Sequence, residues 1–292
     1  MTYESTVPGG SAARAEHAGR GPDGLPFYRV DFSCDDRDPL QARLNAIFEY
    51  ADDVETKVLH RSRLNLFFLL LDRLSREGAL SRRDSALDIG CNGGAYSRML
   101  SDFGFAHVRG VDIEPRFIET ARREFAFEAP ERSLRFDVGN AEEIDTREKV
   151  DFVLCTEVIE HTSRPDRVVQ VIREILKPGG VAVVTLPNRI SLPFQMAWWA
   201  YRLKRMPKNP EFEDHLNYPF YRSLKLFDFP DLELLQTDGT NLLLPSRLLR
   251  ALYRTPIFGP VHHADFLLSR LWPLKFFTQF FYLVLRKRRS SG

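Results

Sequence analysis

Short apolar runs alternate with segments of helical spacing through the middle of the chain. Five such runs, each bounded by polar or glycine-containing turns, begin at residues 86, 107, 134, 151 and 181. Their length and their regular alternation with helical segments are typical of strand–helix–strand units in a parallel sheet. Two further runs, at 232–239 and 277–287, predict a sixth and a seventh strand. The pattern therefore predicts an α/β fold.

The region before the first strand has a different pattern. Residues 1–30 are rich in Gly, Ala, Pro and charge, and we expect a disordered tail there, with no signal peptide. Residues 31–84 predict a helical extension, in which apolar positions recur from Asp53 to Arg76 and Gly78 ends the helix. Its apolar stretch LFFLLL is too short to cross a bilayer. We expect this helix to pack on the sheet or to cover a cofactor.

Composition excludes several classes of protein. Hydrophobic residues make up 43% of the chain and charged residues 28%, as in ordinary globular proteins. A formal net charge of +1 argues against bulk attraction to nucleic acid. The three cysteines, at 34, 91 and 155, form neither a disulfide framework nor a CxxC pair, which indicates a reducing, cytoplasmic location.

The segment 241–292 is basic and aromatic-rich. It holds nine Lys or Arg residues and one acid, Asp265, a balance of +8 that leaves −7 for residues 1–240. Such a segment is typical of a patch that contacts a membrane surface or an acidic ligand, which allows peripheral membrane contact. The alternative is a core strand followed by a solvated basic tail, and it is favoured for Arg286–Arg289.

A glycine-rich turn follows the first predicted strand, in the sequence ALDIGCNGGAYSRML (86–100). Glycines in such a turn let the backbone approach a ligand, and the following helix presents free N–H groups to it. The spacing Gly90-x-x-Gly93-Gly94 differs from the G-x-G-x-x-G of dinucleotide sites, and Asp88 suits a ligand with a positive end. Both features argue against a nicotinamide dehydrogenase. Asp112, which ends the second strand, is placed to bind two ribose hydroxyls, or to cap a helix.

Six blocks in order, DIGCNGG, GVDIEP, GNAEEI, DFVLCTEVIEH, LKPGG and TLPN, make residues 85–240 resemble the class I S-adenosylmethionine-dependent methyltransferases. The similarity is strongest to the small-molecule O-methyltransferases of the ubiquinone-biosynthesis type. It implies a Rossmann-like, doubly wound sheet of seven strands with the last antiparallel, and residues 242–275 as an insertion before that strand. Two positions depart from the family pattern, since Asn92 replaces a glycine and Asn140 an aspartate.

The resemblance also implies which residues bind S-adenosylmethionine. The loop would pass under the methionine part, Asp112 would bind the ribose, and Ile113 with the Asn140-Ala141 turn would hold the adenine. The predicted cofactor-binding residues are Asp88, Gly90, Cys91, Asn92, Gly93, Gly94, Asp112, Ile113, Asn140, Ala141 and Cys155. The LKPGG block is interpreted as structural, a helix C-terminus stopped by glycines.

Candidate catalytic residues follow the fourth strand in the sequence CTEVIEH. If this turn is helical, Glu157, Glu160 and His161 share one face. Together with His215 they could hold a divalent metal such as Mg or Zn, a pattern that resembles metal-assisted O-methyltransferases. Alternatively, His161 acts as a metal-free general base, or Glu160 and His161 only orient the loop.

The aromatic and proline-rich region 191–230 lies where ligands bind in this fold, and it is the candidate substrate wall. A helical cover on the core is the alternative for any single aromatic residue there. The predicted function is methyl transfer from S-adenosylmethionine to a small or lipid-like acceptor, most readily at oxygen. Two rival functions are a nucleic-acid methyltransferase, disfavoured by the charge balance, and a cofactor-binding scaffold without catalysis.

Overall fold

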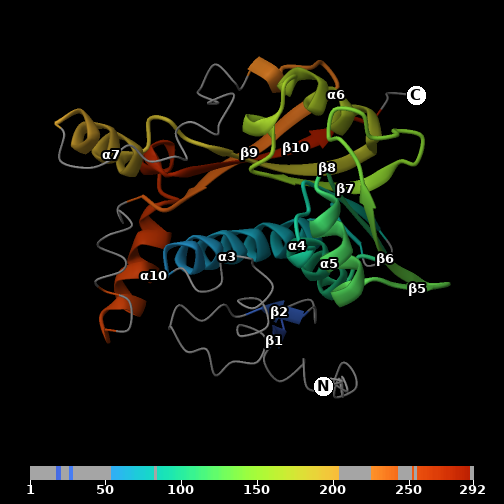
Figure 1. Ribbon diagram of the computed structural model, residues 1–292, viewed down its shortest axis with the longest axis horizontal. Coiled ribbons are helices and arrows are strands. Elements are labelled where there is room, and N and C mark those ends of the chain that lie inside the picture. Colours follow the sequence, from blue (N-terminus) through green and yellow to red (C-terminus); the bar gives the residue numbers. More distant parts are fainter. Residues whose placement is uncertain are drawn as a thin grey trace.

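A mixed eight-stranded sheet with helices on both faces forms the body of the protein (Figure 1). A computed structural model describes residues 18–20, 26–28, 54–81, 84–203, 225–242, 252 and 255–289. Across the sheet the strands are β5 (Phe127–Ala129), β6 (Arg132–Val138), β4 (His107–Asp112), β3 (Ser85–Ile89), β7 (Val150–Thr156), β8 (Leu176–Pro187), β10 (Phe280–Lys287) and β9 (Leu232–Thr240).

Strand directions follow the doubly wound plan. The five strands from β6 to β8 are parallel, whereas β10 is antiparallel to both of its neighbours, β8 and β9. The seven predicted strands and the antiparallel last strand are thereby confirmed. The sheet also contains β5, a short antiparallel edge strand that the sequence pattern did not predict.

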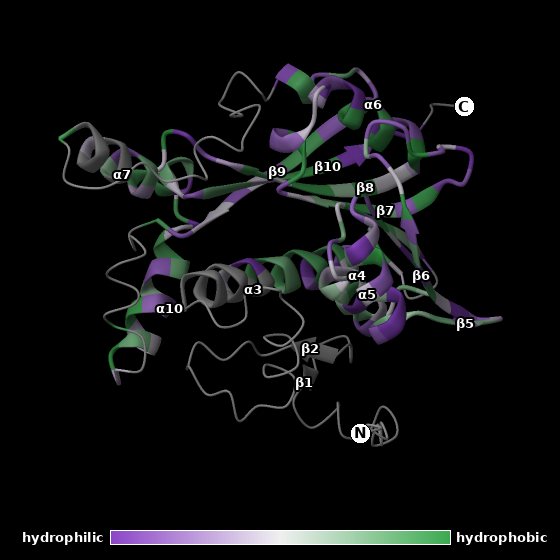
Figure 2. Cartoon of the chain, in the orientation of Figure 1, coloured by the Kyte–Doolittle hydropathy of each residue, from purple (hydrophilic) through white to green (hydrophobic). Residues whose placement is uncertain are grey.

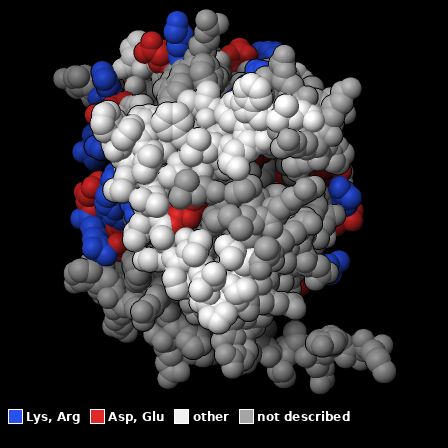
Figure 3. Space-filling view, turned by 90° about the vertical axis from the view of Figure 1, so that its left-hand side faces the viewer, with Lys and Arg blue, Asp and Glu red and all other residues white. Residues whose placement is uncertain are grey.

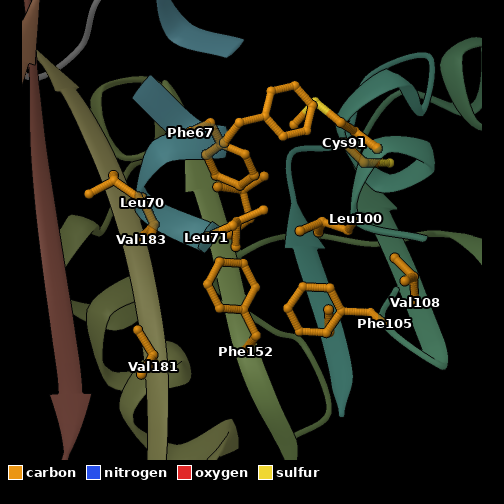
Figure 4. Packing of buried hydrophobic residues seen from close by; sticks show 14 of the residues in the cluster. Phe67, Leu70, Leu71, Cys91, Leu100, Phe105, Val108, Phe152, Val181 and Val183 are labelled. Carbon is orange, nitrogen blue, oxygen red and sulfur yellow. The ribbon is translucent and has the colours of Figure 1, made fainter. Parts of the chain in front are cut away.

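One face of the sheet is covered by α3 (Val54–Arg76), α4 (Ala95–Phe103) and α5 (Pro115–Phe125). Phe67, Leu70 and Leu71 of α3 pack among the side chains of β7 and β8, as Figure 4 shows. Each of these three side chains is at most 2% exposed, so α3 is an integral part of the core. The predicted helix, its end near Gly78 and its packing on the sheet are confirmed.

The opposite face is covered by α6 (Pro165–Ile175), whose valines and isoleucines form a second core cluster with β7, β8 and β10. Figure 2 shows hydrophobic residues along α3 and β10 and hydrophilic ones on the outer sides of α5 and α6. The prediction for LKPGG was wrong: α6 ends at Ile175, and residues 176–180 begin β8. Gly179 has a positive φ, and the register between β7 and β8 shifts beside this stretch.

The insertion before β10 makes a long-range contact with α3. It holds α10 (Phe258–Leu268) and the 3₁₀ turn η3 (Leu274–Phe277). His262 Nε2 of α10 lies 2.7 Å from Ser62 Oγ of α3, and both residues are fully buried. The α10 helix therefore fixes α3 one residue before Arg63, which the next section places beside the candidate catalytic residues.

The two ends of the described chain lie apart from this contact. Inside the predicted tail, two short strands, β1 (Ala18–Arg20) and β2 (Pro26–Tyr28), pair with each other, and the rest of residues 1–53 lies outside the described residues. At the other end, Lys287 Nζ donates to the carbonyl oxygens of Arg173 and Leu176. Among the described helices, none has the length and apolar character needed to span a bilayer.

Candidate cofactor and acceptor site

The motif turns predicted from the sequence meet at one edge of the sheet. Because β3, β4, β6, β7 and β8 are parallel neighbours, their carboxyl ends lie together, and each is followed by one of the predicted blocks. In doubly wound folds this edge is where ligands bind. The fold therefore brings the predicted cofactor loop and the predicted catalytic turn to the same edge.

The glycine loop has the backbone conformation that its residue types favour. Gly90 and Gly94 have φ values of 72° and 85°, and Asn92 has a φ of 47°. A β-carbon on Gly90 would overlap the Val158 side chain, so this position needs glycine both for its φ and for space. The amides of Gly90 and Cys91 donate to the Val111 carbonyl, which ties the loop to β4. Gly94 then precedes the first turn of α4.

Asp112 connects the two loops that the cofactor prediction needs. One carboxylate oxygen accepts from the Asn92 amide at 2.8 Å and the other from the Glu114 amide at 2.9 Å. The cap of α5 is Glu114, with Pro115 at its first position, so Asp112 does not cap the helix itself. Each carboxylate oxygen has further acceptor capacity. Asp112 therefore both fixes the glycine loop and offers an acceptor at the edge of the sheet.

Three of the predicted cofactor-binding residues have buried side chains. Asp88 is 0% exposed and accepts from Ser97 Oγ at 2.6 Å. Burial raises the pKa of Asp88 to about 7, against the effect of the Ser97 hydrogen bond. Cys91 and Cys155 are buried free thiols, and burial raises the pKa of each. The side chains of Cys91 and Cys155 belong to the two core clusters, so it is the backbone of these residues that lies at the carboxyl edge of the sheet.

The predicted adenine side of the site is open and apolar. Ile113 is 64% exposed, and Val138, at the end of the neighbouring strand β6, is 49% exposed. Asn140 is half-buried, and its side-chain oxygen accepts from the Glu142 amide at 3.0 Å, which closes a polar turn. Ala141 packs against the core beside it. A flat apolar surface beside a hydrogen-bonding turn suits a heteroaromatic ring.

Glu157 is anchored on two sides at the carboxyl end of β7. Its amide donates to Thr185 Oγ1 at 3.1 Å, and that hydroxyl donates to Glu157 Oε1 at 2.8 Å. Arg63 Nη2 of α3 lies 3.4 Å from Glu157 Oε2. Glu157 also has a φ of 52°, unusual for a residue that is not glycine, and this turns the chain sharply after the strand.

The prediction that Glu157, Glu160 and His161 share a helical face was wrong. The helical turn is a 3₁₀ segment of three residues, η1 (Ile159–His161), and Glu157 lies outside it with a left-handed backbone. Glu160 is fully buried, whereas His161 is exposed. Within the described residues no three His, Cys, Asp or Glu side chains are placed to hold a metal ion. His215, the fourth predicted ligand, lies outside the described residues.

Glu160 is a buried carboxyl group next to the Glu157–Arg63 pair. Neither carboxyl oxygen has a hydrogen-bond partner among the described residues. Burial, and then the nearby Glu157 carboxylate, raise the pKa of Glu160 well above its ordinary value, against the smaller effect of Arg63. Burial and the Glu157 carboxylate therefore both disfavour the charged form of Glu160.

Sequence reasoning missed the basic and phenolic side chains of this site. Arg63 lies over the Phe280 ring at 3.8 Å, and burial raises the pKa of Tyr96 to about 12 beside it. Arg63 lies one helical turn before Phe67, on the face of α3 that packs on the sheet. A charged residue at that spacing on an apolar face is the signal that could have identified it.

The predicted substrate wall is described only in part. The helix α7 (Leu192–Arg202) follows β8, and Trp199 on it is 55% exposed. The predicted wall also includes the aromatic residues Phe212, Tyr218, Phe220 and Tyr221, which lie outside the described residues, as do the side chains of Trp198 and Tyr201. Their part in an acceptor site stays a prediction.

Comparison with known proteins identifies the central domain. The family described as "Methyltransferase domain" matches residues 87–184. A ubiquinone biosynthesis O-methyltransferase of Cereibacter sphaeroides is 40% identical over 114 residues, which are 38% of this chain and 44% of that protein. A namesake from Shewanella pealeana is 28% identical over 191 residues, 64% of this chain and 77% of that protein. The chain thus matches less than half the length of the Cereibacter protein.

Solved structures agree on the fold. Magnesium protoporphyrin IX methyltransferase from Synechocystis PCC 6803, with bound SAH, has a TM-score of 0.54 at 13% identity, covering 79% of this chain and 86% of that one. A putative sarcosine dimethylglycine methyltransferase from Galdieria sulphuraria has a TM-score of 0.52 at 18% identity, covering 77% and 86%. The solved structures thus agree with the strand order on the fold, and within that fold residues 87–184 match the methyltransferase domain family.

Proposed function

We propose that the protein transfers a methyl group from S-adenosylmethionine to an oxygen atom of a small or lipid-like acceptor. The observation that carries the proposal is that the Asp112-anchored glycine loop and the Arg63–Glu157 pair lie at one edge of the sheet. The names of the matched relatives, which are O-methyltransferases, support oxygen as the methylated atom.

The described residues fit the cofactor in their chemistry. Asp112 supplies an acceptor for ribose hydroxyls, and the exposed Ile113 and Val138 side chains supply an apolar surface for adenine. Arg63 is a cation whose side chain is 14% exposed and whose Nε atom lacks a partner among the described residues, so it suits a carboxylate such as that of the methionine part. The bound cofactor would supply a methyl group on a sulfonium, whose sulfur leaves as a neutral thioether when the methyl group is transferred.

Methyl transfer of this kind is an in-line displacement, so the residues mainly need to hold the acceptor oxygen in line with the methyl group. The acceptor hydroxyl must lose its proton. Glu157 is a carboxylate at this edge that Thr185 and Arg63 hold in place, and His161 is exposed in the turn that follows it. We infer that Glu157 orients the acceptor hydroxyl and that His161 takes its proton, because an imidazole titrates near neutral pH. A metal forms no part of this inference.

The cofactor half of the proposal is tested by replacing Asp112 with alanine. We expect calorimetry to show S-adenosylmethionine and S-adenosylhomocysteine bound by the unaltered protein, and about tenfold or more weaker binding by Asp112→Ala. The reason is that the variant loses the ribose acceptor and frees the Asn92 amide that holds the loop. Asp137→Ala removes an acid from the neighbouring strand β6, paired with Arg109, and is the control that should bind normally. Unchanged binding by Asp112→Ala would contradict the assignment.

The catalytic half is tested by combining Glu157→Gln with His161→Ala. Glutamine keeps a side-chain oxygen for the Thr185 hydroxyl, so the loop should stay in place. We expect cofactor affinity to stay within a few-fold, while transfer of labelled methyl to a catechol or a prenylated catechol is lost. His107→Ala, at the start of β4 and so at the opposite edge, is the matched histidine control. An equal loss of cofactor binding in the double variant would show that the two residues are structural.

A further inference from the structure

Two buried hydroxyl groups, near the start of β10 and at the end of β9, lack hydrogen-bond partners. Tyr282 of β10 is 1% exposed and Thr240 of β9 is 0% exposed. Within the part of the chain that the structure describes, neither Tyr282 Oη nor Thr240 Oγ1 forms a hydrogen bond of normal geometry. Burying a hydroxyl without a partner costs free energy, so the two groups call for a partner from outside the chain.

A row of polar side chains connects Tyr282 to Glu157 across the sheet. Thr185 of β8 is directly opposite Tyr282 in the antiparallel pairing, so both side chains lie on the face that α3 covers. The Thr185 hydroxyl already donates to Glu157 Oε1 at 2.8 Å. On the other side, Asp238 of β9 is directly opposite Tyr282, and its carboxylate accepts from Arg270 at 3.3 Å. Both polar neighbours are thus engaged elsewhere.

The Tyr282 hydroxyl is a donor at this position. Burial raises the pKa of Tyr282 well above its ordinary value, against the effects of the Arg63 charge and of the Thr240 hydroxyl beside it. The phenol therefore keeps its proton and can donate it in a hydrogen bond. Such a group binds an oxygen atom of a ligand, and it does not compete with His161 for the role of base.

Tyr282 lies on the side of β7 that faces away from the cofactor loops. The glycine loop follows β3, and the sheet continues from β3 through β7 and β8 to β10. Glu157, at the carboxyl end of β7, lies between the two. Arg63 reaches Glu157 from α3, and its guanidinium also lies 3.8 Å from the ring of Phe280, two residues before Tyr282. A molecule that receives a methyl group beside Glu157 therefore meets β8 and β10 on its far side.

The described surface at this end of the molecule offers few charged groups. Figure 3 views the side at which Figure 1 shows α7 and α10, beyond the end of β9 and the start of β10. The described side chains there are mostly uncharged, and Lys and Arg lie along the margins. The buried row is thus the described set of polar groups closest to Glu157 on this side of the sheet.

We propose that the Tyr282 hydroxyl binds the methyl acceptor by donating a hydrogen bond to one of its oxygen atoms. The inference rests on the proposed function and deepens it. Glu157 holds the hydroxyl that receives the methyl group, and Tyr282 with Thr240 holds a second oxygen of the same molecule. That oxygen is uncharged, because the two hydroxyls carry no charge to offset a buried anion and Arg63 is paired with Glu157.

Thermal denaturation of the unliganded protein tests whether the two hydroxyls serve the fold. Tyr282→Phe and Thr240→Val each remove a buried hydroxyl without a partner, so we expect denaturation midpoints equal to or above that of the unaltered chain. Thr278→Val is the matched control. Thr278 is also fully buried, but its hydroxyl donates to the Lys275 carbonyl at 2.7 Å, so this variant should have a lower midpoint.

Transfer of labelled methyl to two probe acceptors, catechol and phenol, tests the contact itself. We expect Tyr282→Phe to lower kcat/KM for catechol by about tenfold or more, chiefly through a higher KM. Phenol lacks the second oxygen, so its kcat/KM should be the same in both proteins. Calorimetry should show S-adenosylhomocysteine bound equally by both, because Tyr282 lies away from the cofactor loops.

Three results would overturn the inference. They are an unchanged kcat/KM for catechol in Tyr282→Phe, an equal loss with catechol and phenol, and a lower denaturation midpoint of the unliganded variant, which would give the hydroxyl a structural role. A failure of the proposed function has a different signature: the unaltered chain would bind no cofactor, or would bind it and methylate neither probe. The inference needs a methyl acceptor and would then fall with the proposed function.

Discussion

Gly90→Ala is expected to abolish cofactor binding and to lower the free energy of unfolding by about 3 kcal/mol. Two costs add at this position. A side chain at a φ of 72° costs roughly 1–2 kcal/mol, and the new methyl group overlaps Val158 Cγ2, which must move or push the loop away. Since the same loop would pass under the cofactor, displacement removes the binding surface as well. Chemical denaturation and calorimetry measure the two effects.

Gly78 provides a matched control because its φ is 71° and no atom lies within 4 Å of the added β-carbon. Gly78→Ala should cost about 1 kcal/mol and leave cofactor binding intact. The difference between the two alanine variants isolates the clash. Adding Val158→Ala to Gly90→Ala should recover part of the stability, and failure to recover any of it would show that the Val158 contact is not the cause.

Arg63→Met is expected to destabilise the fold by about 3 kcal/mol near pH 8 and to stop methyl transfer. The variant leaves the Glu157 carboxylate without the cation that faces it from α3, with both side chains less than one fifth exposed. It also removes the Arg63 charge, which lowers the pKa of Glu160 and so partly offsets the increase that burial causes. A carboxyl whose folded pKa is raised contributes stability at low pH and loses it as pH rises through that pKa. The deficit of the variant should therefore become smaller as pH falls through the pKa of Glu160.

Arg73→Met, on the same helix, is the control. Arg73 forms an exposed i,i+4 pair with Glu77, and its loss should change stability by less than about 0.5 kcal/mol at any pH. Arg63→Lys keeps the charge and should recover part of the stability. A deficit of Arg63→Met that is constant across pH would contradict the contribution of Glu160 and leave the lost Glu157 pair and the lost packing on Phe280 as its causes.

Local patterns were sufficient to predict much of this fold. Each predicted strand carries its own apolar run and turn, and the Gly90 loop needs only its own residues to adopt a positive φ. The short edge strand β5 was not predictable, because all three of its residues are exposed and no apolar pattern marks it. The LKPGG block was misjudged because its glycines suit a helix end, whereas pairing with β7 placed it in a strand.

The candidate site was less predictable, because its side chains come from distant elements. Asp112 could be assigned from its place after a strand, but its contact with the Asn92 amide depends on the pairing of β3 with β4. The proposed grouping of Glu157 with Glu160 and His161 assumed a helical turn, which the left-handed backbone of Glu157 prevents. Arg63 reaches the site because α3 packs against the sheet, and the apolar pattern that predicted this packing did not indicate which side chains Arg63 would face.

The place of β10 between β8 and β9 has a consequence for synthesis. Protein chains emerge from the ribosome amino end first, so β9 is made before β10. In the described sheet, however, β9 pairs only with β10, which lies between β8 and β9. Until β10 emerges, β8 presents an open apolar edge and β9 has no strand beside it in the sheet. Closing the sheet thus depends on a late, long-range event, which makes it the slow step expected in folding and the stage most exposed to aggregation.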